Sequence, residues 1–233
     1  MSSREVVGKA AAGTRTARGP AGLASRTRVR RGPTEMARLK QDLLARARHI
    51  YAGEGPEALS MRRLAQDLGL STMALYSYFP SKHALLEALW LEVFEALRAE
   101  LTDAAKGLRA PLKVMEAHLR GYLGFWEARP EQFRMIYMST PHTAEGDAVP
   151  MKDLPVYAEL LRLEGQRVAA CSGRGQPPGA DLLAEVSALA LTKLIGYLLL
   201  VLGIPRYPLP DRDALRERVV ADALSGIAEG LGG

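Results

Sequence analysis

The sequence has little of the chemistry that enzymes, metalloproteins and disulfide-stabilised proteins require. Its 233 residues include a single cysteine, Cys171, which excludes an intrachain disulfide framework and fits a reducing cytosol. The histidines show neither the H-x-x-x-H nor the Cys/His spacing of a metal site, and no G-x-S-x-G elbow or phosphate-cradling loop is present. We therefore expect no enzymatic activity, no metal and no cofactor. The four histidines are interpreted as surface or packing residues: His49, His83, His118 and His142.

Long uncharged apolar runs are also missing. The most apolar stretch, residues 181–204, is interrupted by Asp181, Glu185 and Lys193, so that only residues 194–204 are free of charge. That length is short of the roughly 20 residues that cross a bilayer. The N-terminus has no apolar signal-peptide core either. We expect a cytoplasmic protein with no membrane span, in which residues 181–204 are covered by protein.

Charge is concentrated at the N-terminus. Residues 1–32 carry eight lysines and arginines against Glu5 alone, and almost no large apolar side chains. Such a segment cannot bury enough surface to fold, so the sequence predicts a disordered basic tail over 1–32. Two interpretations stay open. The tail either adds non-specific phosphate contacts to DNA, or it has no role, as it would if translation began at Met36.

From Pro33 onward the pattern is helical, and the fold class predicted is all-α. Apolar residues recur at helical spacing in each segment, whereas residues 107–111, 139–152 and 172–179 are rich in turn-forming residues. Residues 85, 89, 93, 97 and 101 form the clearest stripe, on a long helix that begins near Ser81. Further helices are expected over 34–52, 111–128, 130–138, 153–171, 180–203 and 211–231.

Residues 60–82 are the most informative segment. Ser60 can cap a short helix, Gly69 can form the turn that follows it, and Ser71 can cap a second helix that Pro80 ends. This arrangement is a helix-turn-helix, whose second helix has the size to enter the major groove of B-DNA. Spacing alone leaves a second interpretation open, because a short helical corner occurs in many unrelated proteins.

The stretch from Leu39 to Leu89 resembles the N-terminal domain of TetR-family (tetracycline-repressor-type) transcriptional regulators. Its LAQDLGLS and LYSYFPSK motifs, followed by a leucine pair, carry the resemblance. There are two departures. Tyr78 stands where many members have histidine, and Pro56 precedes the second helix. The matching positions are Leu64, Ala65, Leu68, Gly69, Leu75, Tyr76, Phe79, Lys82, Leu85 and Leu86.

The resemblance implies a three-helix DNA-binding domain over 33–80 and a helical ligand-binding and dimerisation domain over 81–233. It implies base-edge contacts for Arg62, Thr72 and Met73, and phosphate contacts for Ser60, Tyr76, Tyr78 and Lys82. Solvation remains the alternative for Arg62, and partial core packing for Tyr76. The full set of predicted DNA-binding residues is Ser60, Arg62, Arg63, Ser71, Thr72, Met73, Tyr76, Ser77, Tyr78 and Lys82.

By the same resemblance, the last two helices pair with their symmetry mates in a homodimer. Ala190 and Gly196 either permit the close approach of these helices or pack in the core of one subunit. The dimer binds a pseudo-palindromic operator in double-stranded DNA as a repressor, and a small-molecule effector releases it. Two alternatives remain: transcriptional activation, and a DNA-binding or partner-binding protein that responds to no effector.

The effector is expected in the C-terminal domain. Lys193 is the unusual residue there, because it shares an apolar stripe and a buried ammonium group needs a partner. Three interpretations stay open. The amine contacts an acidic effector, it contacts a carboxylate such as that of Glu164 or Glu185, or it extends to solvent. Ordinary core packing is the alternative for the rest of the predicted lining, which comprises Phe125, Trp126, Met135, Met138, Tyr157, Lys193 and Tyr197.

Overall fold

The computed structural model describes residues 32–55, 57–138, 151, 154–173, 178–204, 206–209 and 211–232. The predictions for the basic tail and for Pro56 therefore concern residues outside the described part of the chain, apart from Gly32. The same holds for His142 and for nearly all of the loop predicted at 139–152.

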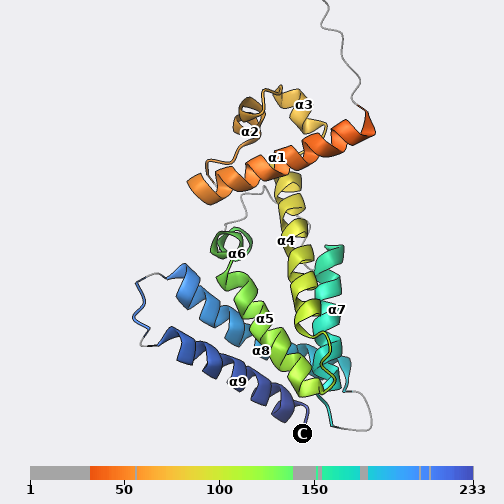
Figure 1. Cartoon of the computed structure of the whole chain (residues 1–233), viewed down its shortest axis with the longest axis vertical. Helices are drawn as coiled ribbons and strands as arrows, with labels where there is room; N and C mark the ends of the chain where they lie inside the picture. The colour runs from red at the N-terminus through yellow and green to blue at the C-terminus, as the bar shows by residue number, and fades with distance from the viewer. Residues whose placement is uncertain are drawn as a thin grey trace, which may run out of the picture.

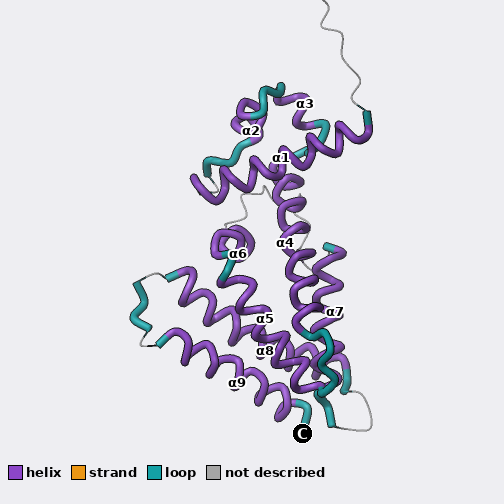
Figure 2. Tube along the Cα trace, viewed as in Figure 1, coloured by secondary structure: helices purple, strands orange, loops and turns teal. Residues whose placement is uncertain are grey.

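All regular secondary structure in the described residues is helical, which confirms the all-α prediction (Figure 2). Most helix ends lie within two residues of those expected from the sequence. The helices are α1 (Pro33–Glu54), α2 (Met61–Asp67), α3 (Thr72–Tyr76), α4 (Lys82–Ala104), α5 (Pro111–Glu127), α6 (Pro130–Tyr137), α7 (Pro155–Ala170), α8 (Ala180–Leu198), the π-helical turn η2 (Leu199–Gly203) and α9 (Arg212–Gly230).

The molecule consists of a small head and a larger helical body (Figure 1). Helices α1, α2 and α3 form the head at one end, and α4 runs from the head into the body. In the body α4 packs on α5 and α7, while α8 lies against α9. The helices α5, α8 and α9 pack on one another away from the head.

The head has its own apolar core. Leu43, Ala47 and Ile50 of α1 are fully buried, as are Leu64 of α2 and Leu75 of α3. Burying a leucine or isoleucine side chain contributes roughly 1.5–3 kcal/mol. The burial of the α1 residues agrees with the helical spacing of apolar side chains expected over 34–52.

The corner between α2 and α3 is a Schellman turn. The N–H of Leu70 donates to the carbonyl of Ala65 at 2.8 Å, and the N–H of Gly69 donates to that of Gln66 at 3.1 Å. Gly69 has a φ of +63°, a conformation that side chains with a Cβ rarely adopt. The predicted role of Gly69 is confirmed.

Helix α4 connects the head and the body through one apolar stripe. The five residues predicted to form it are all buried, with exposures of 0 to 3%. Ser81 caps the helix, because its Oγ accepts a hydrogen bond from the N–H of Ala84 at 3.0 Å. Leu85, at the head end, and Leu101, 16 residues further along, belong to one continuous core.

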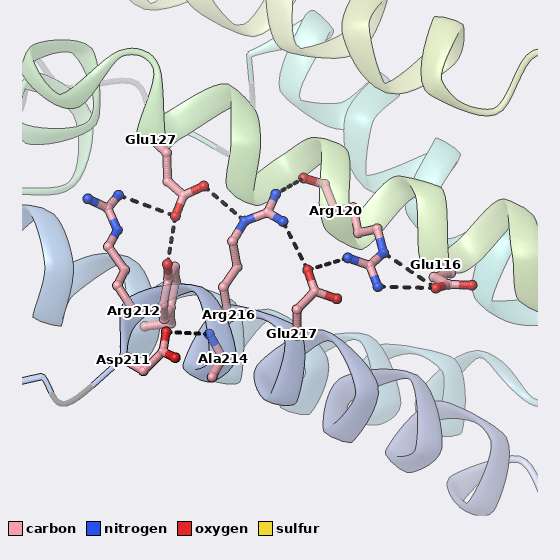
Figure 3. A network of polar contacts seen from close by, with 9 residues as sticks. Glu116, Arg120, Glu127, Asp211, Arg212, Ala214, Arg216 and Glu217 are labelled. Atoms are coloured by element: carbon pink, nitrogen blue, oxygen red, sulfur yellow. Dashed lines mark hydrogen bonds and ion pairs between the residues drawn. The ribbon is translucent and has the colours of Figure 1, made fainter.

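A network of hydrogen bonds and ion pairs joins α9 to α5 (Figure 3). Glu127 of α5 accepts hydrogen bonds from Arg216 Nε at 2.9 Å and from Tyr197 Oη at 2.6 Å. Arg216 also donates to the carbonyl of Arg120 at 3.0 Å, and Arg120 pairs with Glu217. The network holds the last helix in a defined register on the body.

Replacing Gly69 with alanine tests the head corner. No atom lies within 4 Å of the position that a Cβ would take, so the cost is backbone strain alone. We expect a loss of about 1 kcal/mol in the free energy of unfolding, measured by urea denaturation.

Gly53→Ala is the matched control, since Gly53 lies in α1 with an open Cβ position and without a positive φ. Its expected effect is neutral or stabilising by up to about 1 kcal/mol. Equal effects of the two substitutions would contradict the assignment of strain to Gly69.

Candidate functional site

The short helix α3 is held by two anchors and a cap. Leu75 is fully buried and Phe79, just beyond the helix, is 2% exposed. Ser71 caps the helix, with its Oγ accepting from the N–H of Ala74 at 3.1 Å. At the other end Ser77 Oγ donates to the carbonyl of Ala74 at 2.6 Å. The inner side of α3 is thereby fixed, and the outer side is free for contact.

The outer side of α3 faces solvent. Met73 is 79% exposed, Tyr76 is 43% exposed and Ser77 is exposed as well. Thr72 and Tyr78 are partly exposed. No partner in the described part of the fold accounts for the exposure of this methionine and tyrosine on so short a helix. Because they are exposed, they form the surface that would contact a groove of DNA.

Helix α2 contributes two arginines with different surroundings. Arg62 is exposed and forms no ion pair with a described residue. Arg63 bonds Asp67 through its Nε at 3.0 Å, and its Nη2 lies 3.2 Å from Glu54. Because the charge of Arg63 is compensated within the head, Arg62 is the stronger of the two predicted DNA contacts.

Asp67 is the centre of a cluster that joins α1 to α2. It accepts from Arg46 Nε at 2.8 Å as well as from Arg63. The hydrogen bond from Arg46, followed by that from Arg63, lowers the pKa of Asp67, while burial opposes the shift. The cluster orients α2 and was not foreseen from the sequence, because Arg46 and Asp67 are 21 residues apart.

Two cations, Lys82 and Lys40, lie near the segment that follows α3. Lys82, the first residue of α4, follows the cap Ser81, at a helix end where a cation is disfavoured by the dipole and a phosphate would relieve the conflict. Lys40 of α1 is exposed, and its Nζ lies 5.7 Å from the centre of the Phe79 ring. Nothing in the spacing pointed to Lys40, since the contact exists only after α1 packs across the other helices.

The body contains two cavities that share the wall residue Glu164. One, of about 30 Å³, lies among α4, α5, α6, α7 and α8. The other, of about 330 Å³, lies between α7 and α8. Of the predicted effector residues, Tyr157 lines the first cavity. Three polar residues that line it, His118, Tyr122 and Glu164, were not among those predicted.

A buried His118–Arg167 pair lies next to these cavities. Arg167 Nη1 is 2.7 Å from His118 Nδ1. Since a guanidinium only donates, Nδ1 accepts, and the imidazole is neutral. Burial, together with the Arg167 charge, lowers the pKa of His118 to about 3. Amphipathic spacing predicts burial for such residues but gives no sign of their mutual contact.

The aromatic residues predicted to line the effector site pack mainly with one another. Trp126 is fully buried, with its ring centre 4.9 Å from that of Phe125 and 5.7 Å from that of Phe133. Met135 is also buried and lines a separate pocket of about 290 Å³ between α1 and the start of α6. Met138 is 43% exposed. Phe125 and Trp126 therefore pack in the core, which was the alternative to lining the effector site.

Lys193 and Tyr197 both have protein partners. Lys193 Nζ lies 2.8 Å from Asp222 Oδ2 and 3.0 Å from the carbonyl oxygen of Asp222. Lys193 therefore meets a carboxylate, but that of Asp222 on α9 and not that of Glu164 or Glu185. Its side chain is 38% exposed, so the alternative that the amine extends to solvent also holds. Burial and the hydrogen bond to Glu127 raise the pKa of Tyr197 to about 12.

The family model matches residues in the head and the first part of α4, whereas the solved structures match most of the chain. Residues 43–89 match the family model described as "Bacterial regulatory proteins, tetR family". The chain is 41% identical over 90 residues to the HTH-type transcriptional repressor DrrR1 of Streptomyces coeruleorubidus, covering 38% of this chain and 32% of DrrR1. It is 28% identical over 103 residues to the nucleoid occlusion factor SlmA of Haemophilus influenzae, covering 44% and 47%. The chain thus spans about half the length of curated relatives such as SlmA.

Solved structures extend the similarity of fold to most of the chain. SCO4313, described as a regulatory protein, superposes with a TM-score of 0.65 at 19% identity, covering 84% of this chain and 99% of its own. A TetR/AcrR-family regulator from Thermobifida fusca gives 0.55 at 18% identity, covering 81% and 98%. At such identities the likeness establishes the fold alone.

Arg62 and Arg63 provide a paired test of the candidate interface. For Arg62→Ala we expect binding to duplex DNA to weaken by about 1–3 kcal/mol, because an uncompensated cation is removed from the surface. The unfolding midpoint should stay unchanged. Fluorescence anisotropy with a labelled duplex selected for binding measures the affinity.

Arg63→Ala is expected to lower the stability of the head, because Asp67 and Glu54 lose their partner, and to weaken DNA binding less than Arg62→Ala does. Thermal denaturation of both variants separates the two effects. A larger loss of DNA affinity in Arg63→Ala, with unchanged stability, would show that the ion pairs do not decide which arginine is available.

Proposed function

We propose that this chain, a member of the TetR family of bacterial regulatory proteins, represses transcription by binding a pseudo-palindromic operator as a homodimer and is released by a small-molecule effector. Its site of action is then the cytoplasm. One observation carries the proposal. A short helix, α3, is anchored by Leu75 and Phe79 while Met73 and Tyr76 extend into solvent. Arg62, on the preceding helix α2, is exposed and forms no ion pair with a described residue. The predicted DNA-binding residues of this surface remain the candidates for base and phosphate contact.

Dimerisation is supported by the exposed face of α8. Residues 180–203 are long and apolar enough, by length and composition, to span a membrane, yet only 33% of their most apolar window is buried in the single chain. Leu189 is 58% exposed, and Gly196 has no atom within 4 Å of a would-be Cβ. Ala190, in contrast, is 3% exposed and belongs to the protomer's own core. A partner subunit on the Leu189 and Gly196 face would cover the apolar surface.

Two recognition helices in such a dimer would meet successive major grooves about 34–36 Å apart. An effector that favours a different separation of the heads would then release the operator by shifting the population of states. Helix α4 is the connection through which the body acts on the head, because its stripe is buried in both.

One observation favours an alternative without an effector. The cavity among α4, α5, α6, α7 and α8 holds only about 30 Å³, which is close to the space of a single water molecule. A regulator with a filled core would show no rise in melting temperature with any compound in a thermal-shift screen, whereas a binder of the folded state raises it.

Selection of bound sequences from a random duplex library tests the DNA proposal. We expect enrichment of an inverted repeat, with an affinity that exceeds that for unrelated duplex by at least about 10³-fold at physiological salt. Repression of in vitro transcription from a promoter that contains the repeat tests the direction of control. Binding without any enriched sequence would overturn the proposal, and stimulated transcription would establish an activator.

Leu189→Glu tests the dimer. A carboxylate buried without a partner in the interface costs several kcal/mol, so we expect the dimer dissociation constant to rise at least about 100-fold in sedimentation equilibrium. The inverted repeat should then be bound more weakly, because each head binds alone.

Leu108→Glu is the control, since Leu108 is 43% exposed in the turn between α4 and α5 and is on neither helix of the proposed interface. This variant should remain dimeric. A dimer that survives Leu189→Glu and dissociates on Leu108→Glu would move the interface elsewhere.

A further inference from the structure

Glu164 is an acidic side chain without a counter-ion at the boundary of the two body cavities. It lies on α7 and lines both the smaller cavity of about 30 Å³ and the larger one of about 330 Å³. No ion pair joins it to another described residue, and desolvation by its surroundings raises the pKa of its carboxyl to about 7. A carboxyl group at this position reduces stability whenever it is ionised. An ionised carboxylate there is stabilised by a cationic partner, which the described residues of the folded chain do not supply.

Arg162, two residues before Glu164, is exposed, and residues two apart on a helix do not face each other. The basic group one turn away on the same face of α7 is already engaged. Arg167 lies one turn further along α7, but its Nη1 contacts His118 Nδ1 at 2.7 Å. Desolvation lowers the pKa of Arg167, and no acidic group offsets that effect. Arg167 therefore contributes to the packing of α7 on α5 and leaves Glu164 uncompensated.

The other groups around Glu164 are uncharged near neutral pH. His118 is neutral, and burial raises the pKa of each tyrosine in the lining. Helices α4 and α8 contribute only apolar residues and one serine. The residues facing the shared wall from each packed helix are Leu97 and Leu101 (α4), His118 and Tyr122 (α5), Tyr137 (α6), Tyr157 (α7), and Ser187 and Leu191 (α8).

Ser187 is a second polar group that lacks a partner. Its Oγ is buried and makes no hydrogen bond, and Ser187 lines the 330 Å³ cavity together with Glu164. A hydroxyl oxygen accepts hydrogen bonds, as a carboxylate does. The cavity thus presents two unused acceptors, from α7 and α8, in a lining that is otherwise apolar.

We propose that the cavity between α7 and α8 binds a small apolar molecule that carries a protonated amine, with its ammonium group between Glu164 and Ser187. The apolar part of the ligand packs among Leu161, Leu183 and Leu191. The volume of about 330 Å³ falls at the lower end of the range for small-molecule sites. This inference names the chemical class of the effector and so rests on the proposed function.

Three matched probes test the charge preference: 4-phenylbutylamine, 4-phenylbutan-1-ol and 4-phenylbutanoate, which share one apolar part and differ in charge. Binding to the full chain without DNA is measured by isothermal titration calorimetry at pH 8. We expect the amine to bind at least about tenfold more tightly than the alcohol. Tighter binding of the butanoate would overturn the proposal in favour of an anion near Arg167. Absence of amine binding at millimolar concentration would overturn it as well.

Glu164→Gln keeps the shape of the side chain and removes its charge. In this variant the amine should lose its advantage and bind within about threefold of the alcohol, whose affinity should not change. Glu159→Gln is the control, because Glu159 lies on the same helix but is exposed and paired with Arg98 at 3.4 Å. An amine advantage that persists in Glu164→Gln would contradict the assignment.

The unaltered protein gives an independent readout, should the variant fail to fold. An ammonium ion favours the ionised carboxylate, so binding lowers the pKa of Glu164 and releases a proton near pH 7. The affinity for the amine should rise about tenfold from pH 6 to pH 8, while that for the alcohol stays constant. Calorimetry in two buffers of different ionisation enthalpy measures the proton release, and its absence would contradict the role of Glu164.

The proposed function is tested separately by adding each probe to the protein bound to its inverted repeat. If the amine binds but does not release DNA, the chemical assignment stands and the effector role fails. If the chain binds and represses its operator but ignores the amine, the assignment fails and the regulator role stands.

Discussion

The structure depends on the continuity of α4. A helix of 23 residues is about 35 Å long, and it holds its stripe of leucine and valine side chains in the core of the head at one end and of the body at the other. Any change in the packing of α5 or α7 on its lower half therefore moves the position where α4 enters the head. The cap at Ser81 and the turn before it set the angle of that entry.

Charged residues divide into two groups with separate consequences. Arg46, Arg63 and Asp67 compensate one another and orient α2 on α1, and the Glu127 network does the same for α9 on α5. Arg62 and Glu164 have no ion-pair partner among the described residues, one on the surface of the head and the other at the cavities of the body. These two residues lie at the two places where we propose a ligand, DNA in one case and an amine in the other.

Local signals allowed most of the fold to be predicted. Caps, proline and glycine positions, and the spacing of apolar residues depend on neighbours within a few turns, so the helices and the positive φ of Gly69 could be derived directly. Contacts between residues far apart in the chain could not. Lys193 illustrates this, because periodicity left an acidic effector, a carboxylate and solvent open as partners of its amine and did not indicate Asp222, 29 residues away. Likewise, the spacing of residues in the sequence did not show that Trp126 packs in the core while Glu164 lines the two cavities.

The central claim is that the outer face of α3 lies in a groove of DNA, twice per dimer. Met73, at 79% exposure, permits a direct measurement: Met73→Cys in a Cys171→Ala background, conjugated to phenanthroline–copper, cleaves DNA wherever α3 lies. The account predicts two cleavage centres related by the symmetry of the enriched inverted repeat, about one helical turn or a multiple of it apart. A Leu108→Cys conjugate should give none. Cleavage spread evenly along the duplex, or absent while the protein remains bound, would contradict the account.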